Sequence, residues 1–309
     1  MIALVVATIV AAVAVGVAIE RRSPLDAQLV AARLVKAMIW AGIPFATFFV
    51  MARLELTAGL GVGLLIAYAS IAVVGGLAYL AGTRLLRLPR PSVGALVLVV
   101  ILANTGYLGV PLNATLLGED AIAPALAFDT VVSGPMFWLF GFALGAAFGD
   151  HGARTTGDRL RGVLVNPPLI AVVAGLLAGQ VGGESLAPDV LLEAAHVVVY
   201  ALLPCGFVLV GIALATEADE GALAFPPRFD AAVGVALALR LVAAPALMLA
   251  GSAIIGGVPD AYLLQAAMPC GINSLVVAHA AGLDLRLCAA AVTWTTAAVV
   301  LVGVAAGFA

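Results

Sequence analysis

The stretch that decides the fold reads Ala-Asn-Thr-Gly-Tyr-Leu-Gly-Val-Pro over residues 103–111. It interrupts an apolar run at 92–117, and a second stretch, Met-Pro-Cys-Gly-Ile-Asn-Ser over residues 268–274, interrupts another run at 260–281. Proline removes a backbone donor and clashes with the preceding turn, and glycine weakens a helix. Both runs are therefore predicted to kink or unwind near their middle.

The composition of the whole chain predicts that these runs lie in a membrane. Of 309 residues, 64% are hydrophobic and only 10% are charged, whereas a soluble domain carries about 25% charged residues. The net charge of −3, with no basic tail, excludes a nucleic-acid partner. The three cysteines and three histidines have no metal-ligand spacing, and no nucleotide-binding or nucleophile motif is present. We therefore expect neither an enzyme nor a cofactor.

Apolar runs separated by short charged or Gly/Pro-rich breaks predict an all-α integral membrane protein of ten transmembrane helices. The spans should be helical because backbone groups in lipid need partners within their own segment. The expected spans are 2–19, 29–51, 57–82, 92–117, 121–148, 163–180, 190–215, 229–256, 260–281 and 285–307.

Lysine and arginine predict the orientation. The odd-numbered loops and their flanks hold twelve basic residues, and the even-numbered loops hold Arg53 alone. The positive-inside rule then puts the odd loops in the cytoplasm and both termini outside the cell membrane. The twelve are Arg21, Arg22, Arg33, Lys36, Arg84, Arg87, Arg90, Arg154, Arg159, Arg161, Arg228 and Arg286.

The two halves of the chain resemble each other at an offset of about 160–164 residues. Pro44 is matched by Pro204, and Gly-Glu-Asp at 118–120 is matched by Gly-Leu-Asp at 282–284. Five spans per half is an odd number, so the second copy is expected upside down, a construction typical of secondary transporters. The expected divisions are a first repeat at 1–148, a cytoplasmic linker at 149–162 and a second repeat at 163–309.

The two interrupted helices, the fourth and the ninth, are expected to cross and form one midplane binding site. Unwinding exposes N–H groups at the start of each second half-helix, where the helix dipole favours an anion. Asn104 and Asn273 would add amide donors and acceptors. The alternative interpretation is a pair of proline kinks with small residues for close packing. The expected substrate-binding residues are Asn104, Thr105, Gly109, Pro111, Pro269, Gly271, Asn273 and Ser274.

Asp129, Arg240 and His279 are candidates for a role because ionisable side chains are costly within membrane spans. Asp129 is either a proton or cation site coupled to transport or a carboxylate bonded to Thr130 or Ser133. Arg240 either neutralises a substrate anion or fastens the helices, through Asp129 or a helix C-terminus. His279 either titrates between pH 5 and 8 as part of coupling or lies at the membrane interface.

These motifs resemble the auxin efflux carrier family, which includes plant auxin carriers and bacterial malate and malonate permease-like proteins. The similarity rests on Asn-Thr-x-x-x-Gly-x-Pro-Leu at 104–112, Arg-Leu-Val-Ala-Ala-Pro at 240–245 and Leu-Gln-Ala-Ala-Met-Pro-Cys-Gly-Ile at 264–272. Asn-Pro-Pro at 166–168 is similar to the start of the sixth span in prokaryotic members. Plant members carry lysine in place of His279 and proline in place of Ser274, which argues against auxin itself as the substrate.

The resemblance implies a sodium/proton-antiporter-like fold and a substrate-binding role for Asn104, with Asn273 as its counterpart. It also implies a scaffold of spans 1, 2, 6 and 7, a transport bundle of spans 3–5 and 8–10, elevator-like alternating access, and a homodimer joined through scaffold helices. The expected partners are the bilayer and a small organic anion such as malate, malonate or an auxin-like carboxylate. The alternatives are a sodium/organic-anion symporter of the bile-acid type and, in another class, a channel.

Overall fold

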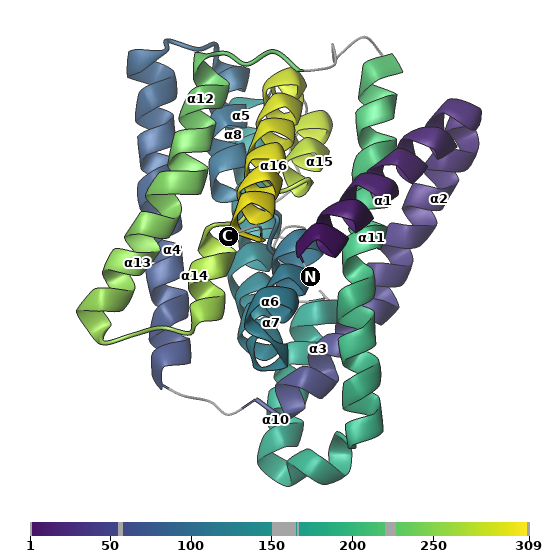
Figure 1. The fold of residues 1–309 in the computed structure, drawn as a ribbon. Helices are drawn as coiled ribbons and strands as arrows, with labels where there is room; N and C mark the ends of the chain where they lie inside the picture. Colours follow the sequence, from purple (N-terminus) through teal and green to yellow (C-terminus); the bar gives the residue numbers. More distant parts are fainter. Residues whose placement is uncertain (1, 55–57, 150–164, 166, 220–226, 308–309) are drawn as a thin grey trace.

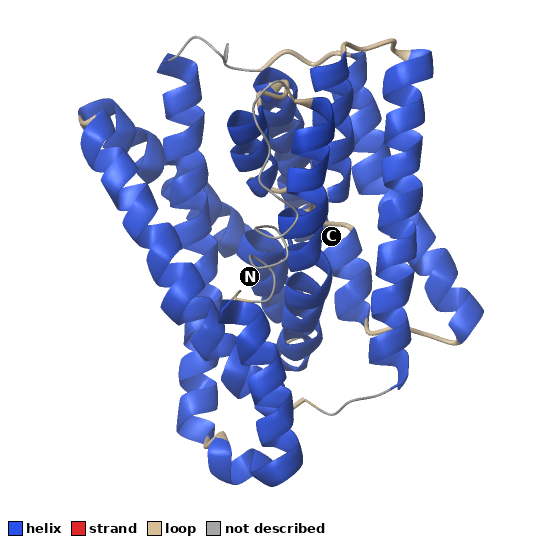
Figure 2. Ribbon diagram, turned by 180° about the vertical axis from the view of Figure 1, so that it is seen from behind, coloured by secondary structure: helices blue, strands red, loops and turns tan. Residues whose placement is uncertain are grey.

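The structure, a computed structural model, describes residues 2–54, 58–149, 165, 167–219 and 227–307. Within these residues the secondary structure is helical, with no strand (Figure 2). The label η marks short π-helical segments and, at η4, a short 3-10 helix. The first part of the chain forms α1 (Ile2–Arg22), α2 (Pro24–Ala37), η1 (Met38–Gly42), α3 (Ile43–Ala52), α4 (Ala58–Leu80) and η2 (Ala81–Leu85).

The fourth and fifth apolar runs form a chain of shorter helical segments. These are α5 (Arg90–Ile101), η3 (Thr105–Gly109), α6 (Val110–Leu117), η4 (Glu119–Ala121), α7 (Ile122–Phe128), η5 (Asp129–Ser133), η6 (Met136–Gly141) and α8 (Phe142–Phe148). Most of the predicted linker at 149–162, and Asn166 of the Asn-Pro-Pro motif, lie outside the described residues.

The second part of the chain forms longer helices around one further interruption. Its elements are α10 (Pro167–Leu186), α11 (Asp189–Asp219), α12 (Ala231–Ala238), η7 (Leu239–Ala243), α13 (Ala244–Ile255), α14 (Asp260–Ala266), α15 (Asn273–Ala281) and α16 (Leu285–Gly307). Pro44 lies in the first turn of α3, whereas Pro204 lies inside the long helix α11.

Helix length and composition fit a membrane protein. Among the described residues, four stretches are long and apolar enough to cross a bilayer, at 61–85, 189–209, 231–255 and 285–302. Large apolar side chains on the outer surface are strongly exposed, such as Val181 and Ile254, each at 84%. Apolar exposure of this extent is unfavourable in water and favourable in lipid. The chain is thus an all-α membrane protein.

The helix connections gather at two opposite ends of the molecule (Figure 1). The turns from α1 to α2 and from α4 to α5 lie at the upper end of the view. The turns from α10 to α11 and from α13 to α14 lie at the lower end. Connections thus alternate between two sides, as a chain that crosses a bilayer repeatedly requires.

Two groups of helices are visible in Figure 1, with α6 and α7 between them. In one group, α1 packs along α11, and α3 packs along α10 and α11. In the other group, α4 packs on α5 and α13, and α16 packs on α5 and α12. An apolar cluster joins the first group to α6 and α7, and includes Val50, Val172, Val199, Val110 and Leu126.

Candidate functional site: the crossing of two interrupted helices

Both polar stretches are interrupted where the glycines and prolines predict. The fourth run leaves helical geometry at 102–104, between α5 and η3. The ninth run leaves it at 267–272, between α14 and α15. Each interruption frees backbone N–H and C=O groups, which need partners because the surroundings are apolar.

The two interruptions satisfy part of this need by pairing with each other. The Asn104 N–H donates to the Pro269 carbonyl at 2.8 Å, and the Gly271 N–H donates to the Leu102 carbonyl at 2.7 Å. Ala103 and Cys270 form the antiparallel bridge between these bonds. Gly271 permits this close approach, because a Cβ there would lie 2.8 Å from the Ala103 carbonyl oxygen. The chain segments therefore cross in direct backbone contact.

Asn104 lies at this crossing with an unpaired amide. It precedes η3 and is 4% exposed, and its Nδ2 group is buried without a hydrogen-bond partner. An unsatisfied buried donor costs about 1–3 kcal/mol, so natural proteins keep few of them. The amide of Asn104 is therefore a buried donor for which the protein supplies no acceptor.

Thr105 connects the crossing to Asp129. Its hydroxyl lies 2.5 Å from Asp129 Oδ1, to which it donates, and 2.8 Å from the Ser133 hydroxyl. The carboxylate also faces Gly106, where an added Cβ would lie 3.1 Å from Asp129 Oδ2. Thr130, which the sequence offered as a partner of Asp129, has its hydroxyl buried and unpaired instead. The partner is Thr105, on a different helix.

The ninth-helix residues lie differently. Asn273 begins α15 and is exposed, whereas Ser274 is fully buried and donates its hydroxyl to the Gly271 carbonyl at 2.7 Å. Pro269 contributes its carbonyl to the pairing described above. In the fourth run, Gly109 and Pro111 are buried at the start of α6. Asn104 lies in the crossing and is buried, whereas Asn273 directly follows the crossing and is exposed.

Arg240 is 2% exposed. Each hydrogen bond found for its side chain goes to a backbone carbonyl. Its guanidinium donates to the carbonyls of Met268 at 3.0 Å, Val100 at 3.1 Å and Ala266 at 2.5 Å. Ala266 ends α14 and Val100 lies in the last turn of α5, so Arg240 binds the C-terminal ends of both interrupted helices. No such bond to Asp129 is found.

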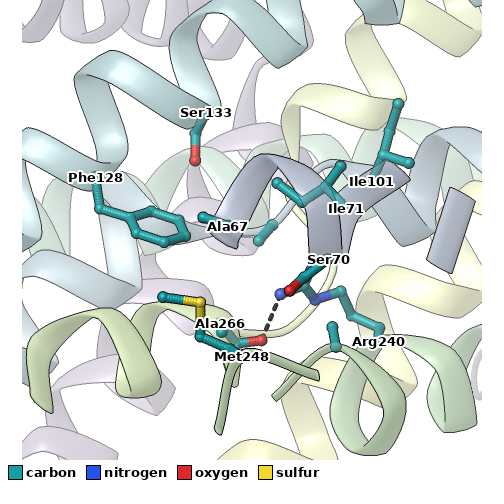
Figure 3. Close-up of a pocket in the computed structure, with 11 residues that line it drawn as sticks. Ala67, Ser70, Ile71, Ile101, Phe128, Ser133, Arg240, Met248 and Ala266 are labelled. Carbon is teal, nitrogen blue, oxygen red and sulfur yellow. Dashed lines mark hydrogen bonds between the residues drawn. The ribbon is translucent and has the colours of Figure 1, made fainter. Parts of the chain in front are cut away.

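A small pocket lies beside the crossing (Figure 3). Its wall is mainly apolar, with the hydroxyls of Ser70 and Ser133 and the guanidinium of Arg240 as the polar groups. The pocket touches Ala103 but is not lined by Asn104 or Asn273. It therefore reaches the crossing from the side of α4 and α13.

His196 and His279, the two histidines among the described residues, lie away from the crossing. His279 is exposed in the last turn of α15. His196, on α11, has its Nδ1 3.2 Å from a carboxylate oxygen of Glu119 in η4. Within the part of the chain that the structure describes, no group of three or more His, Cys, Asp or Glu side chains has the arrangement of a metal site.

The sequence analysis missed two residues that bind the interrupted segments. Gln265 is fully buried and donates to the carbonyls of Thr105 at 3.3 Å and Ala125 at 3.0 Å. The Thr295 hydroxyl accepts the Cys270 N–H at 3.1 Å and donates to the Ala291 carbonyl. Gln265 could have been identified from the sequence, because glutamine is unusual inside an apolar run. Thr295 could not, because a threonine in a helix is common.

The chain is similar in sequence to known membrane transport proteins. A family described as membrane transport protein matches residues 154–304. An uncharacterized transporter of Methanocaldococcus jannaschii is 27% identical over 230 residues, which is 72% of this chain and 70% of the relative.

Proposed function

Because this chain belongs to the auxin efflux carrier family of membrane transport proteins, we propose that it carries a small organic anion across the cell membrane by alternating access. The family and the apolar helices make the protein a multi-pass membrane transporter. The observation that carries the proposal is the unpaired, buried amide of Asn104 at the crossing. Malate, malonate and related carboxylates are the proposed substrates.

The substrate carboxylate would accept hydrogen bonds at the crossing. Asn104 Nδ2 is a free donor there, and the positive ends of the half-helices that begin after the crossing favour an anion. Asn273, exposed at the first turn of α15, supplies a second amide. Thr105, Gly109, Pro111, Pro269, Gly271 and Ser274 shape the backbone around these two groups.

Asp129 is the proposed coupling group. A carboxylate inside an apolar bundle is costly, and protonation removes the charge. Thr105 donates to this carboxylate and directly follows Asn104 in the chain. Protonation of Asp129 would weaken that bond and so reach the substrate site through one residue. His279, which is exposed, would act at most as an outer proton exchange group.

The proposed architecture is ten spans in two inverted repeats, at 1–148 and 163–309, joined by a linker at 149–162. The mutual pairing of the two interruptions supports it, as do Gly118 and Gly282, which end α6 and α15 with φ of 91° and 71°. The alternation of connections between two ends supports repeated crossing of the bilayer, and the positive-inside rule then puts both termini outside.

Elevator-like movement needs a rigid bundle that slides on a scaffold. We assign spans 1, 2, 6 and 7 to the scaffold and spans 3–5 and 8–10 to the bundle. Within the bundle, Arg240 binds two interrupted helices, and Ser92 donates to Asp284 at 2.6 Å. The cluster between α3, α10, α11 and α6, α7 is apolar, which suits sliding. Exposed apolar side chains on α10 and α11, such as Leu177 and Val197, suit a homodimer through the scaffold.

The test is counterflow in liposomes that contain the purified protein. Labelled malate, malonate, pyruvate and indole acetate would be exchanged by wild type, Asn104→Ala and Asn273→Ala, with pH and sodium varied. We expect saturable exchange of one carboxylate whose affinity falls about 10- to 100-fold in folded Asn104→Ala protein. Exchange that neither substitution alters would contradict the assigned site. Strict sodium dependence would favour a bile-acid-type symporter, and passive conductance without counterflow would favour a channel.

A further inference from the structure

Gln265 is a fully buried polar side chain whose place in the proposed mechanism is not yet explained. It lies on α14, and its Nε2 group donates to the Thr105 carbonyl at 3.3 Å and the Ala125 carbonyl at 3.0 Å. Thr105 begins η3 and Ala125 lies in α7. One amide group therefore contacts the fourth and fifth apolar runs from the ninth.

The two carbonyls already have helical partners. The Thr105 carbonyl accepts the N–H of Val110, and the Ala125 carbonyl accepts the N–H of Asp129. Each carbonyl would therefore keep a hydrogen-bond donor without Gln265. The Gln265 bonds therefore serve to hold two helical segments at a fixed separation.

The position of the amide completes a closed ring of contacts. Gln265 Nε2 binds the Ala125 carbonyl, which accepts the Asp129 N–H. The Asp129 carboxylate accepts from the Thr105 hydroxyl, and the Thr105 carbonyl accepts from Gln265 Nε2. The ring thus has the Thr105–Asp129 bond on one side and Gln265 on the other.

Gly109 leaves the space that the Gln265 amide occupies. A Cβ added at Gly109 would lie 2.0 Å from Gln265 Oε1, so that a side chain at 109 would displace the amide. Oε1 itself is buried without a partner, which is a cost that an apolar residue of similar length would avoid. Since methionine would fill the same volume without this cost, packing alone does not explain glutamine here.

We propose that Gln265 is a positioning residue that sets the geometry of the Thr105–Asp129 bond and thereby links proton binding to substrate binding. The proposal rests on the proposed function, because it assumes an anion at Asn104 and a proton at Asp129. It adds a residue and a role to that function. Without the amide, η3 and the Asp129 helix remain packed but their separation is no longer fixed.

The experiment compares two readouts in liposomes for wild type, Gln265→Met and Gln265→Glu. One is counterflow of the exchanged carboxylate at equal pH on both sides, and the other is accumulation driven by a pH gradient. We expect Gln265→Met to lower gradient-driven accumulation by at least about tenfold and counterflow by no more than about threefold. Gln265→Glu, whose protonated form keeps one donor, should lie between. The matched control is Gln180→Met, on the exposed surface of α10.

A double variant separates positioning from general loss of structure. If Gln265 acts through Asp129, adding Gln265→Met to Asp129→Asn should leave counterflow as it is in Asp129→Asn alone, whereas independent effects would lower it further. Gradient-driven accumulation in Gln265→Met equal to wild type would overturn the proposal, as would a further loss of counterflow in the double variant. If Gln265→Met does not fold, the same comparison is made with Gln265→Glu, alone and combined with Asp129→Asn. Failure of wild type to exchange any anion would instead overturn the proposed function.

Discussion

The interruption after α5 and the interruption after α14 pair through the same backbone pattern but satisfy their other groups differently. The ninth-run break spans six residues, 267–272, and draws on Arg240 for its carbonyls and Thr295 for the Cys270 N–H. The fourth-run break spans three residues, 102–104, and leaves the Asn104 amide unpaired beside a bonded Thr105–Asp129 pair. The ninth-run break is thus held by side chains from other helices, whereas the fourth-run break keeps a buried donor without a partner.

Among the stability changes, loss of Arg240 should be the largest, because Arg240 holds the ends of both interrupted helices. Arg240→Met would leave the carbonyls of Val100, Ala266 and Met268 without their buried donor, and we expect a loss of about 3–5 kcal/mol in stability. The measurement is the thermal unfolding of purified protein in detergent. Arg228→Met, an exposed residue before α12, is the matched control. A stable Arg240→Met protein would mean that its backbone bonds do not hold the interruptions.

The two asparagines should differ in transport. Asn104→Ala removes a buried free donor, so we expect the affinity for the exchanged anion to fall about 10- to 100-fold. Asn273 is exposed, so that Asn273→Ala should cost about two- to fivefold. Concentration dependence of counterflow gives both values. Equal losses would show that the two interruptions contribute equally and would remove the distinction drawn above.

Asp129→Asn should separate exchange from coupling. The amide keeps a group that can accept from Thr105 but cannot bind and release a proton. We therefore expect counterflow to persist, while accumulation driven by an imposed pH gradient falls to the background of empty liposomes. Thr130→Val, whose hydroxyl has no partner, serves as the neighbouring control. Accumulation that still follows the pH gradient would remove Asp129 from coupling.

The smallest effect is expected at Thr295. Thr295→Val removes the acceptor of the Cys270 N–H and should lower stability by about 1 kcal/mol. Thr293→Val is a matched control on the same helix, because the Thr293 hydroxyl is buried without a partner, and that change should be neutral or slightly stabilising. Thermal unfolding of both variants checks the difference. An equal response would show that Thr295 does not support the ninth-run break.

The sequence predicted the helices and both interruptions because these follow from local chemistry. Apolar length predicts a span, and glycine with proline predicts a break. The burial of Asn104 and the exposure of Asn273 depend on packing between distant segments, so two similar motifs looked equivalent. The partner of Asp129 was missed for the same reason, because Thr105 lies 24 residues earlier in the chain. Gln265 was visible in the motif, but its contacts with two other runs were not.

Binding of the exchanged carboxylate to purified protein tests the central claim most directly. Isothermal titration would compare wild type with Asn104→Ala, after thermal unfolding has shown that both are folded. The account predicts saturable binding to wild type and about 10- to 100-fold weaker binding to Asn104→Ala. Equal affinity in the two folded proteins would contradict the claim that the unpaired amide at the crossing holds the substrate.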